Sequence, residues 1–175
     1  MVGITMTSTD STDSALVFRP AEEVDREFIH EMHRQAETWG DESRELGDSF
    51  EEDDHHYVGK WTPDQGGVIV EEAGRRIGAA WLRNFTADNP GTGYVADEYP
   101  EVAIAVAPGN TGKALGKKLM LAVLEQAKEH RKPGVSLCVA EGNERAMKLY
   151  EKLGYEQKGT KHTGGETYAV MLHEF

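Results

Sequence analysis

The sequence predicts a mixed α/β domain, in which helices cover both faces of a central sheet of about six or seven strands. Strand and helix alternate in the second half of the chain, which is typical of parallel strand pairing. The first half contains two strand-like runs, Gly67–Glu71 and Arg76–Phe85, joined by a turn at Gly74. Two such runs with a short glycine turn form an antiparallel hairpin. Both kinds of pairing in one chain favour a mixed sheet.

Further elements follow from the spacing of apolar residues. Leu16–Arg19 reads as a short strand that ends at Pro20. Apolar residues recur at helical spacing in Ala21–Ala36, Thr111–His130 and Asn143–Leu153. Asn143 suits a helix N-cap, and Gly154 suits the position after a helix end. The remaining strands are expected at Val102–Val106, Val135–Val139, Tyr155–Lys158 and Thr167–His173.

Length and composition limit the class of protein. The 175 residues fit one domain, expected over residues 15–175 after a disordered tail, residues 1–14, rich in Ser, Thr and Asp. The net charge of −12 argues against a nucleic-acid-binding surface, which requires a basic face. No apolar run reaches the ~20 residues that span a bilayer, and the N-terminus lacks the features of a signal peptide. We therefore expect a cytoplasmic protein that binds neither nucleic acid nor membrane.

Cysteine and histidine give no sign of a metal site. Cys138, the single cysteine, excludes an internal disulfide and lies within an apolar run, where it reads as a small buried side chain. Residues 40–65 contain a weak helical pair, Leu46 and Phe50, followed by a run of acids. We expect a solvated loop there. His55 and His56 are adjacent and would diverge on a helix or strand, so no metal is expected.

The most informative segment is Pro100–Leu121, PEVAIAVAPGNTGKALGKKLML. It reads as a buried strand, a glycine-bearing turn and the start of an amphipathic helix. Backbone N–H groups and the helix dipole suit a phosphate or pyrophosphate at such a place, and Lys113, Lys117 and Lys118 add positive charge. Alanines on the second face of the strand would leave room for a slender group. A phosphorylated cofactor is therefore expected.

Together these residues resemble the GCN5-related N-acetyltransferases (GNAT family) over about residues 15–175. Four landmarks agree in order: the hairpin VEEAGRRIGAAWL, the turn and helix VAPGNTGKALGKKLM, the strand LCVAEGN and the segment NERAMKLYEKLGY. The last is similar to the family's N-x-x-A-x-x-x-Y-x-K-x-G-[FY] signature. The resemblance implies the GNAT-type acyl-CoA N-acyltransferase fold, with acetyl-CoA as co-substrate and no metal.

The resemblance also assigns the pyrophosphate loop. Its residues would be Thr111, Gly112, Lys113, Ala114, Leu115, Gly116 and Lys117. The loop departs from the family pattern [QR]-x-x-G-x-[GA] at two positions, because Thr111 replaces Arg or Gln and Ala114 replaces Gly. Ala114 is expected to adopt helical dihedral angles. These two replacements would weaken cofactor binding, or the positive charges of Lys113 and Lys117 would compensate for them.

Catalytic roles are implied in the same way. Backbone groups from Ile104 to Val106 would pair with the pantetheine arm, and one N–H could stabilise the oxyanion. Tyr150 would be the general acid at the sulfur, or else a core tyrosine with a satisfied hydroxyl. Asn143 would bind the pantetheine or order the strands, or else only cap its helix. Glu101 would be the general base, or else a solvated charge at a strand end.

The resulting expectation is an acetyl-CoA-dependent N-acetyltransferase. It would move the acetyl group directly to a primary amine of a small molecule, peptide or protein. The acidic segment Glu42–Asp54 favours a positively charged acceptor. One alternative is a non-catalytic acyl-CoA-binding or sensor domain with a degenerate loop, and another is transfer of a longer acyl group. A homodimer is a further possibility, because an exposed strand at the edge of a sheet can pair with a second copy of the chain.

Overall fold

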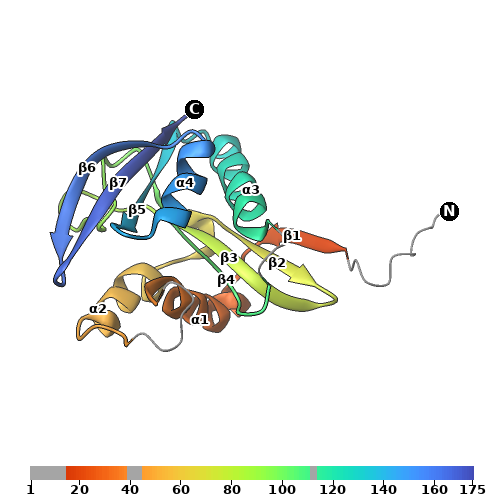
Figure 1. The fold of residues 1–175 in the computed structure, drawn as a ribbon. Helices are drawn as coiled ribbons and strands as arrows, with labels where there is room; N and C mark the ends of the chain where they lie inside the picture. Colours follow the sequence, from red (N-terminus) through yellow and green to blue (C-terminus); the bar gives the residue numbers. More distant parts are fainter. Residues whose placement is uncertain (1–14, 39–44, 111–113) are drawn as a thin grey trace.

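A seven-stranded sheet with the order β1-β2-β3-β4-β5-β7-β6 forms the centre of the computed structural model, which describes residues 15–38, 45–110 and 114–175 (Figure 1). Only β4 and β5 pair in parallel; all other neighbours are antiparallel. The mixed sheet predicted from the sequence is thus confirmed. The strands are β1 (Leu16–Pro20), β2 (Gly67–Glu72), β3 (Arg75–Arg83), β4 (Glu101–Val106), β5 (Gly134–Ala140), β6 (Glu156–Thr163) and β7 (Glu166–Glu174).

Helices cover both faces of this sheet (Figure 1). On one face, α3 (Leu115–Glu129) and α4 (Glu144–Lys152) enclose the larger core, which includes Leu119 and Leu137. On the other, α1 (Arg26–Glu37) and α2 (Phe50–Asp54) belong to the layer of a second core around Trp61 and Trp81. No helix within the described ranges is both long and apolar enough to cross a bilayer.

Side chains of β4 alternate between these two cores, as the period of a strand requires. Val102, Ile104 and Val106 pack against the α3 core, whereas Ala103 and Ala105 pack against the α1 core. The alanine face was expected to leave room for a slender group. Much of that room is taken by α1, which lies over β4. Small side chains here let a helix approach the sheet closely.

The prediction of a solvated loop over residues 40–65 is wrong from Phe50 onward, and residues 40–44 lie outside the described residues. From Phe50 the chain forms α2, and a turn with π-helical hydrogen bonding follows at His55–Gly59. Tyr57, Val58 and Trp61 are buried in the α1 core. The run of acidic residues concealed this helix. Phe50 is the only buried residue of α2, and the other buried residues of the segment follow the helix in the sequence.

Predicted boundaries shift at two other places. The helix predicted from Thr111 begins at Leu115 among the described residues, and Thr111, Gly112 and Lys113 lie outside them. The last two strands are longer than predicted and meet at a turn formed by Gly164 and Gly165. Both glycines have positive φ, so the turn permits a hairpin where the sequence suggested separate strands.

Candidate active site

Strands β4 and β5 separate soon after they begin. Their pairing is limited to Glu101 opposite Ser136, and the Ser136 amide donates to the Pro100 carbonyl. The amide of Ala107, which directly follows β4, donates to the Ile77 carbonyl on β3. Backbone direction alternates along a strand, so the amides of Ile104 and Val106 point the other way, toward β5. Beyond the paired residues they face the gap between the strands.

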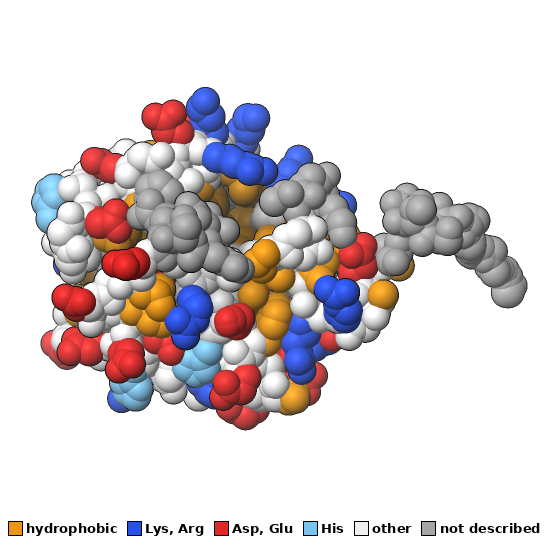
Figure 2. Space-filling model, turned by 60° about the horizontal axis from the view of Figure 1, so that its bottom comes forward, with side chains coloured by type: hydrophobic (Ala, Val, Ile, Leu, Met, Phe, Trp, Pro, Cys, Tyr) orange, Lys and Arg blue, Asp and Glu red, His pale blue; other side chains and the backbone are white. Residues whose placement is uncertain are grey.

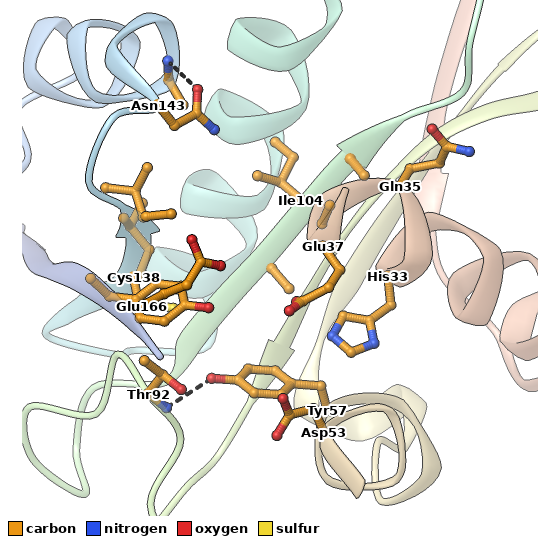
Figure 3. A pocket seen from close by; sticks show the side chains of 18 of the residues that line it. His33, Gln35, Glu37, Asp53, Tyr57, Thr92, Ile104, Cys138, Asn143 and Glu166 are labelled. Carbon is orange, nitrogen blue, oxygen red and sulfur yellow. Dashed lines mark hydrogen bonds between the residues drawn. The ribbon is translucent and has the colours of Figure 1, made fainter. Parts of the chain in front are cut away.

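A pocket of about 500 Å³ occupies this gap. Backbone and side chains of β4 and β5 form its walls, and residues of both helical layers line it. Asn143 lines it from the α4 side, while His33 and Asp53 line it from the α1 and α2 side (Figure 3). Tyr150 of α4 is also among the lining residues. Two molecules could therefore enter from opposite faces of the sheet and meet at the splayed strands.

Glu101 lies in the wall of this pocket and is only 2% exposed. The Tyr57 hydroxyl donates to its Oε2 at 2.6 Å, and the Gly93 amide donates to its Oε1 at 3.0 Å. Burial nevertheless dominates and raises the pKa of Glu101 to about 7. The alternative of a solvated strand-end charge is therefore wrong, because tertiary packing encloses the first residue of β4.

Tyr150 lines the pocket from the inner side of α4. Burial raises the pKa of its phenol to about 12, so the hydroxyl keeps its proton at neutral pH. The hydroxyl makes no hydrogen bond to any described residue, unlike a core tyrosine with a satisfied hydroxyl. Asn143 both caps α4, accepting from the Ala146 amide at 3.4 Å, and lines the pocket.

None of the described residues at the start of α3 is among those that line this pocket. Ala114 is its N-cap and has a left-handed backbone, with φ 55° and ψ 33°. The expectation of helical dihedral angles at Ala114 is therefore wrong. The structure gives the reason that glycine is usual there, since a side chain costs about 1–2 kcal/mol in this conformation. Leu115 is buried, Gly116 approaches Leu149, and Lys117 is exposed.

The α1 side of the pocket contains residues that the sequence analysis did not single out. His33, Glu37 and Asp53 lie close together there, and Tyr57 lies beside them (Figure 3). Helical spacing is the signal that could have found His33, which follows Ile29 by four residues on the buried face of α1. No local signal joins α1 to α2, because that contact depends on tertiary packing.

The surroundings of His55, His56 and Cys138 give no indication of a metal site. His56 stacks on Phe85 and bonds the Pro90 carbonyl through Nε2 at 3.0 Å, whereas His55 is exposed. In the described part of the chain, no cluster of three or more His, Cys, Asp or Glu could hold a metal ion. Cys138 lines the pocket near Glu101, and burial raises the pKa of its thiol well above the usual value.

Solved structures with a similar fold are acetyltransferases. The ribosomal-protein-S18-alanine N-acetyltransferase of Escherichia coli is 15% identical, with a TM-score of 0.67 over 91% of this chain and 94% of that one. The yncA protein of Salmonella typhimurium, solved with its cofactor acetyl-CoA, is 19% identical, with a TM-score of 0.67 over 92% and 94%. At these identities the likeness establishes the fold.

Sequence comparison agrees with the fold. The mycothiol acetyltransferase of Gordonia bronchialis is 32% identical over 109 residues, which cover 54% of this chain and 35% of that protein. That of Frankia alni is 30% identical over 133 residues, covering 66% and 38%. The matched region spans only about a third of the length of the curated relatives, between 29% and 38%. The acetyltransferase (GNAT) family matches residues 26–155, and the chain belongs to this family.

Proposed function

We propose that this protein transfers the acetyl group of acetyl-CoA directly to a primary amine. The main support is the pocket between the diverging β4 and β5, which contains a protonated phenol and a carboxyl group of raised pKa. Acyl transfer to an amine needs a proton donor for the thiolate and a proton acceptor for the nitrogen. Tyr150 on α4 and Glu101 on β4 supply these two functions.

In this proposal the donor lies on the α3 and α4 side. The loop from Thr111 to Lys117 holds the pyrophosphate through backbone amides, and the amides of Ile104 and Val106 bind the pantetheine arm as a neighbouring strand would. Asn143 contributes a side-chain contact to the same arm. One amide of β4 stabilises the oxyanion of the tetrahedral intermediate.

The reaction then uses two groups that line the pocket, Tyr150 and Glu101. Nitrogen attacks the thioester carbon, and the carbon–oxygen π electrons move to oxygen. When the intermediate collapses, the carbon–sulfur bond breaks and sulfur takes the Tyr150 proton. Glu101 accepts a proton from nitrogen. A pKa of about 7 lets this carboxyl group exchange protons near neutral pH, which is the range a general base requires.

The acceptor in this proposal is a positively charged small molecule or peptide amine. Carboxyl groups line the pocket at Glu37, Glu45, Asp53, Glu101 and Glu166, whereas no lysine or arginine is among its described lining residues. Acidic side chains are also frequent on the face that carries α1 and α2 (Figure 2). A field of one sign attracts an ammonium group and raises its local concentration.

Two measurements test the proposal. Isothermal titration with acetyl-CoA reports binding, and a thiol-release assay over a panel of amines reports transfer. The panel contains alkylamines, diamines, peptides with free N-termini and mycothiol-related amines, because the curated relatives are named mycothiol acetyltransferases. Binding without transfer to any amine would favour a non-catalytic acyl-CoA-binding domain, and no binding would refute both functions.

A further inference from the structure

A buried histidine and a carboxylate meet on the acceptor side of the pocket. His33, on the last turns of α1, lines the pocket and is 6% exposed. Its Nδ1 lies 2.9 Å from Oδ1 of Asp54 at the end of α2. A carboxylate only accepts hydrogen bonds, so Nδ1 must be protonated to make this one. In the neutral ring the free electron pair therefore lies on Nε2.

Packing holds the ring in this orientation. His33 stacks on Phe50 at 5.0 Å and on Tyr57 at 5.6 Å, and its edge meets Trp81 at 6.3 Å. Nε2 makes no hydrogen bond to any described residue. The ring thus presents an unprotonated nitrogen in the pocket wall, as a histidine held by a carboxylate does in other acid–base sites.

We propose that His33, positioned by Asp54, is a second catalytic proton acceptor, which removes the first proton from the acceptor's ammonium group. This role rests on the proposed acetyl transfer. The contact with Asp54 fixes the tautomer, and the aromatic stack fixes the plane of the ring. Asp54 is a positioning residue and does not touch the substrate.

Proton balance explains why two acceptors are useful. An alkyl ammonium, with an ordinary pKa of ~10.4, must lose one proton before it can attack and a second when the amide forms. His33 takes the first proton and Glu101 takes the second. Sulfur gains one proton from Tyr150. The resulting phenolate then regains a proton, which is one of the two that left the nitrogen. One proton in total then leaves for solvent, as the overall reaction requires.

The charges around His33 agree with this role. Burial lowers the pKa of His33, while Asp54 and Asp53 of α2 oppose the shift and His30 of α1 adds to it. Glu37 lies one turn further along α1, and the uncharged Tyr57 lies against the ring. The ring is thus unprotonated at rest, and the neighbouring carboxylates stabilise it once it has gained a proton.

The test compares amines that differ in basicity. His33→Asn keeps a donor for Asp54 but removes the basic nitrogen, and His55→Asn is the matched control. His55 is exposed and does not line the pocket. With a strongly basic alkylamine at pH 7, His33→Asn should lower kcat/KM about 10²-fold. With a weakly basic amine that is already neutral, the loss should largely disappear, and His55→Asn should leave both rates near wild type.

Equal losses for both amines would show a structural role for His33 and overturn the proposal, as would wild-type rates in the variant. Nitrogen NMR of the wild-type imidazole is an independent check that does not depend on how the variant folds. It should find Nδ1 protonated and Nε2 free in the neutral ring, and the reverse tautomer would also overturn the proposal. If the wild type acetylates no amine, the proposed function fails together with this role, whereas an active wild type confines a failure to His33.

Discussion

Replacing Glu101 by Gln should make the protein more stable at alkaline pH while removing activity. Glu101 has a raised pKa in the folded protein, so folding binds a proton between the ordinary value of 4.5 and about 7. Stability from this group is complete below pH 4.5 and is lost as pH rises toward 7. At 1.36 kcal/mol for each pH unit, the loss is about 3 kcal/mol. Gln, which has nearly the same shape and no charge, does not lose this stability as pH rises.

The two hydrogen bonds to Glu101 limit how much the free energy of unfolding should rise in Glu101→Gln. They come from Tyr57 and Gly93, are strongest to the charged form, and are weaker with Gln. The gain of Glu101→Gln above pH 7 should therefore be positive and at most about 3 kcal/mol. Urea unfolding at several pH values measures it, with fluorescence of the buried Trp61 and Trp81 as the signal.

The difference in the free energy of unfolding between wild type and variant reports on Glu101 alone, because the other titrating groups are the same in both proteins. The difference should grow between pH 4.5 and 7 and then stay constant. Above pH 7, where Glu101 is ionised in the wild type, kcat/KM of the variant should be about 10²–10⁴-fold below that of the wild type, because a proton acceptor is lost. A stability difference that does not change with pH would refute the argument that burial raises the pKa of Glu101.

Three further outcomes are expected. Tyr150→Phe should lower kcat about 10²-fold or more and leave acetyl-CoA affinity unchanged, measured by thiol release and titration calorimetry; an unchanged kcat would contradict its acid role. Ala114→Gly should raise stability by about 1 kcal/mol in urea unfolding, because it relieves a left-handed backbone, and a loss would contradict this. Asp53→Asn should raise the KM of a cationic acceptor, whereas the exposed pair Glu51→Gln and Glu52→Gln should not; equal effects would remove Asp53 from the acceptor site.

Much of the fold could be predicted because its signals are local. The alternation of valine and isoleucine with alanine along β4 matches the two cores on its two faces. Asn143 and Gly154 mark the ends of α4 as predicted, since caps depend on neighbouring residues. Residues 50–61 could not be predicted, because charged residues concealed a short helix that depends on packing against α1.

By itself, the sequence determined the mixed sheet, the order of its main elements and the family landmarks, since periodicity and capping depend on residues close together in the chain. Only the tertiary structure decided the state of the titratable groups. Glu101 became a buried carboxyl because Tyr57, 44 positions away, and the loop at Gly93 pack around it. His33 gained its orientation from Asp54, 21 positions away. Burial and long-range contacts set a pKa, and neither can be read from neighbouring residues in the chain.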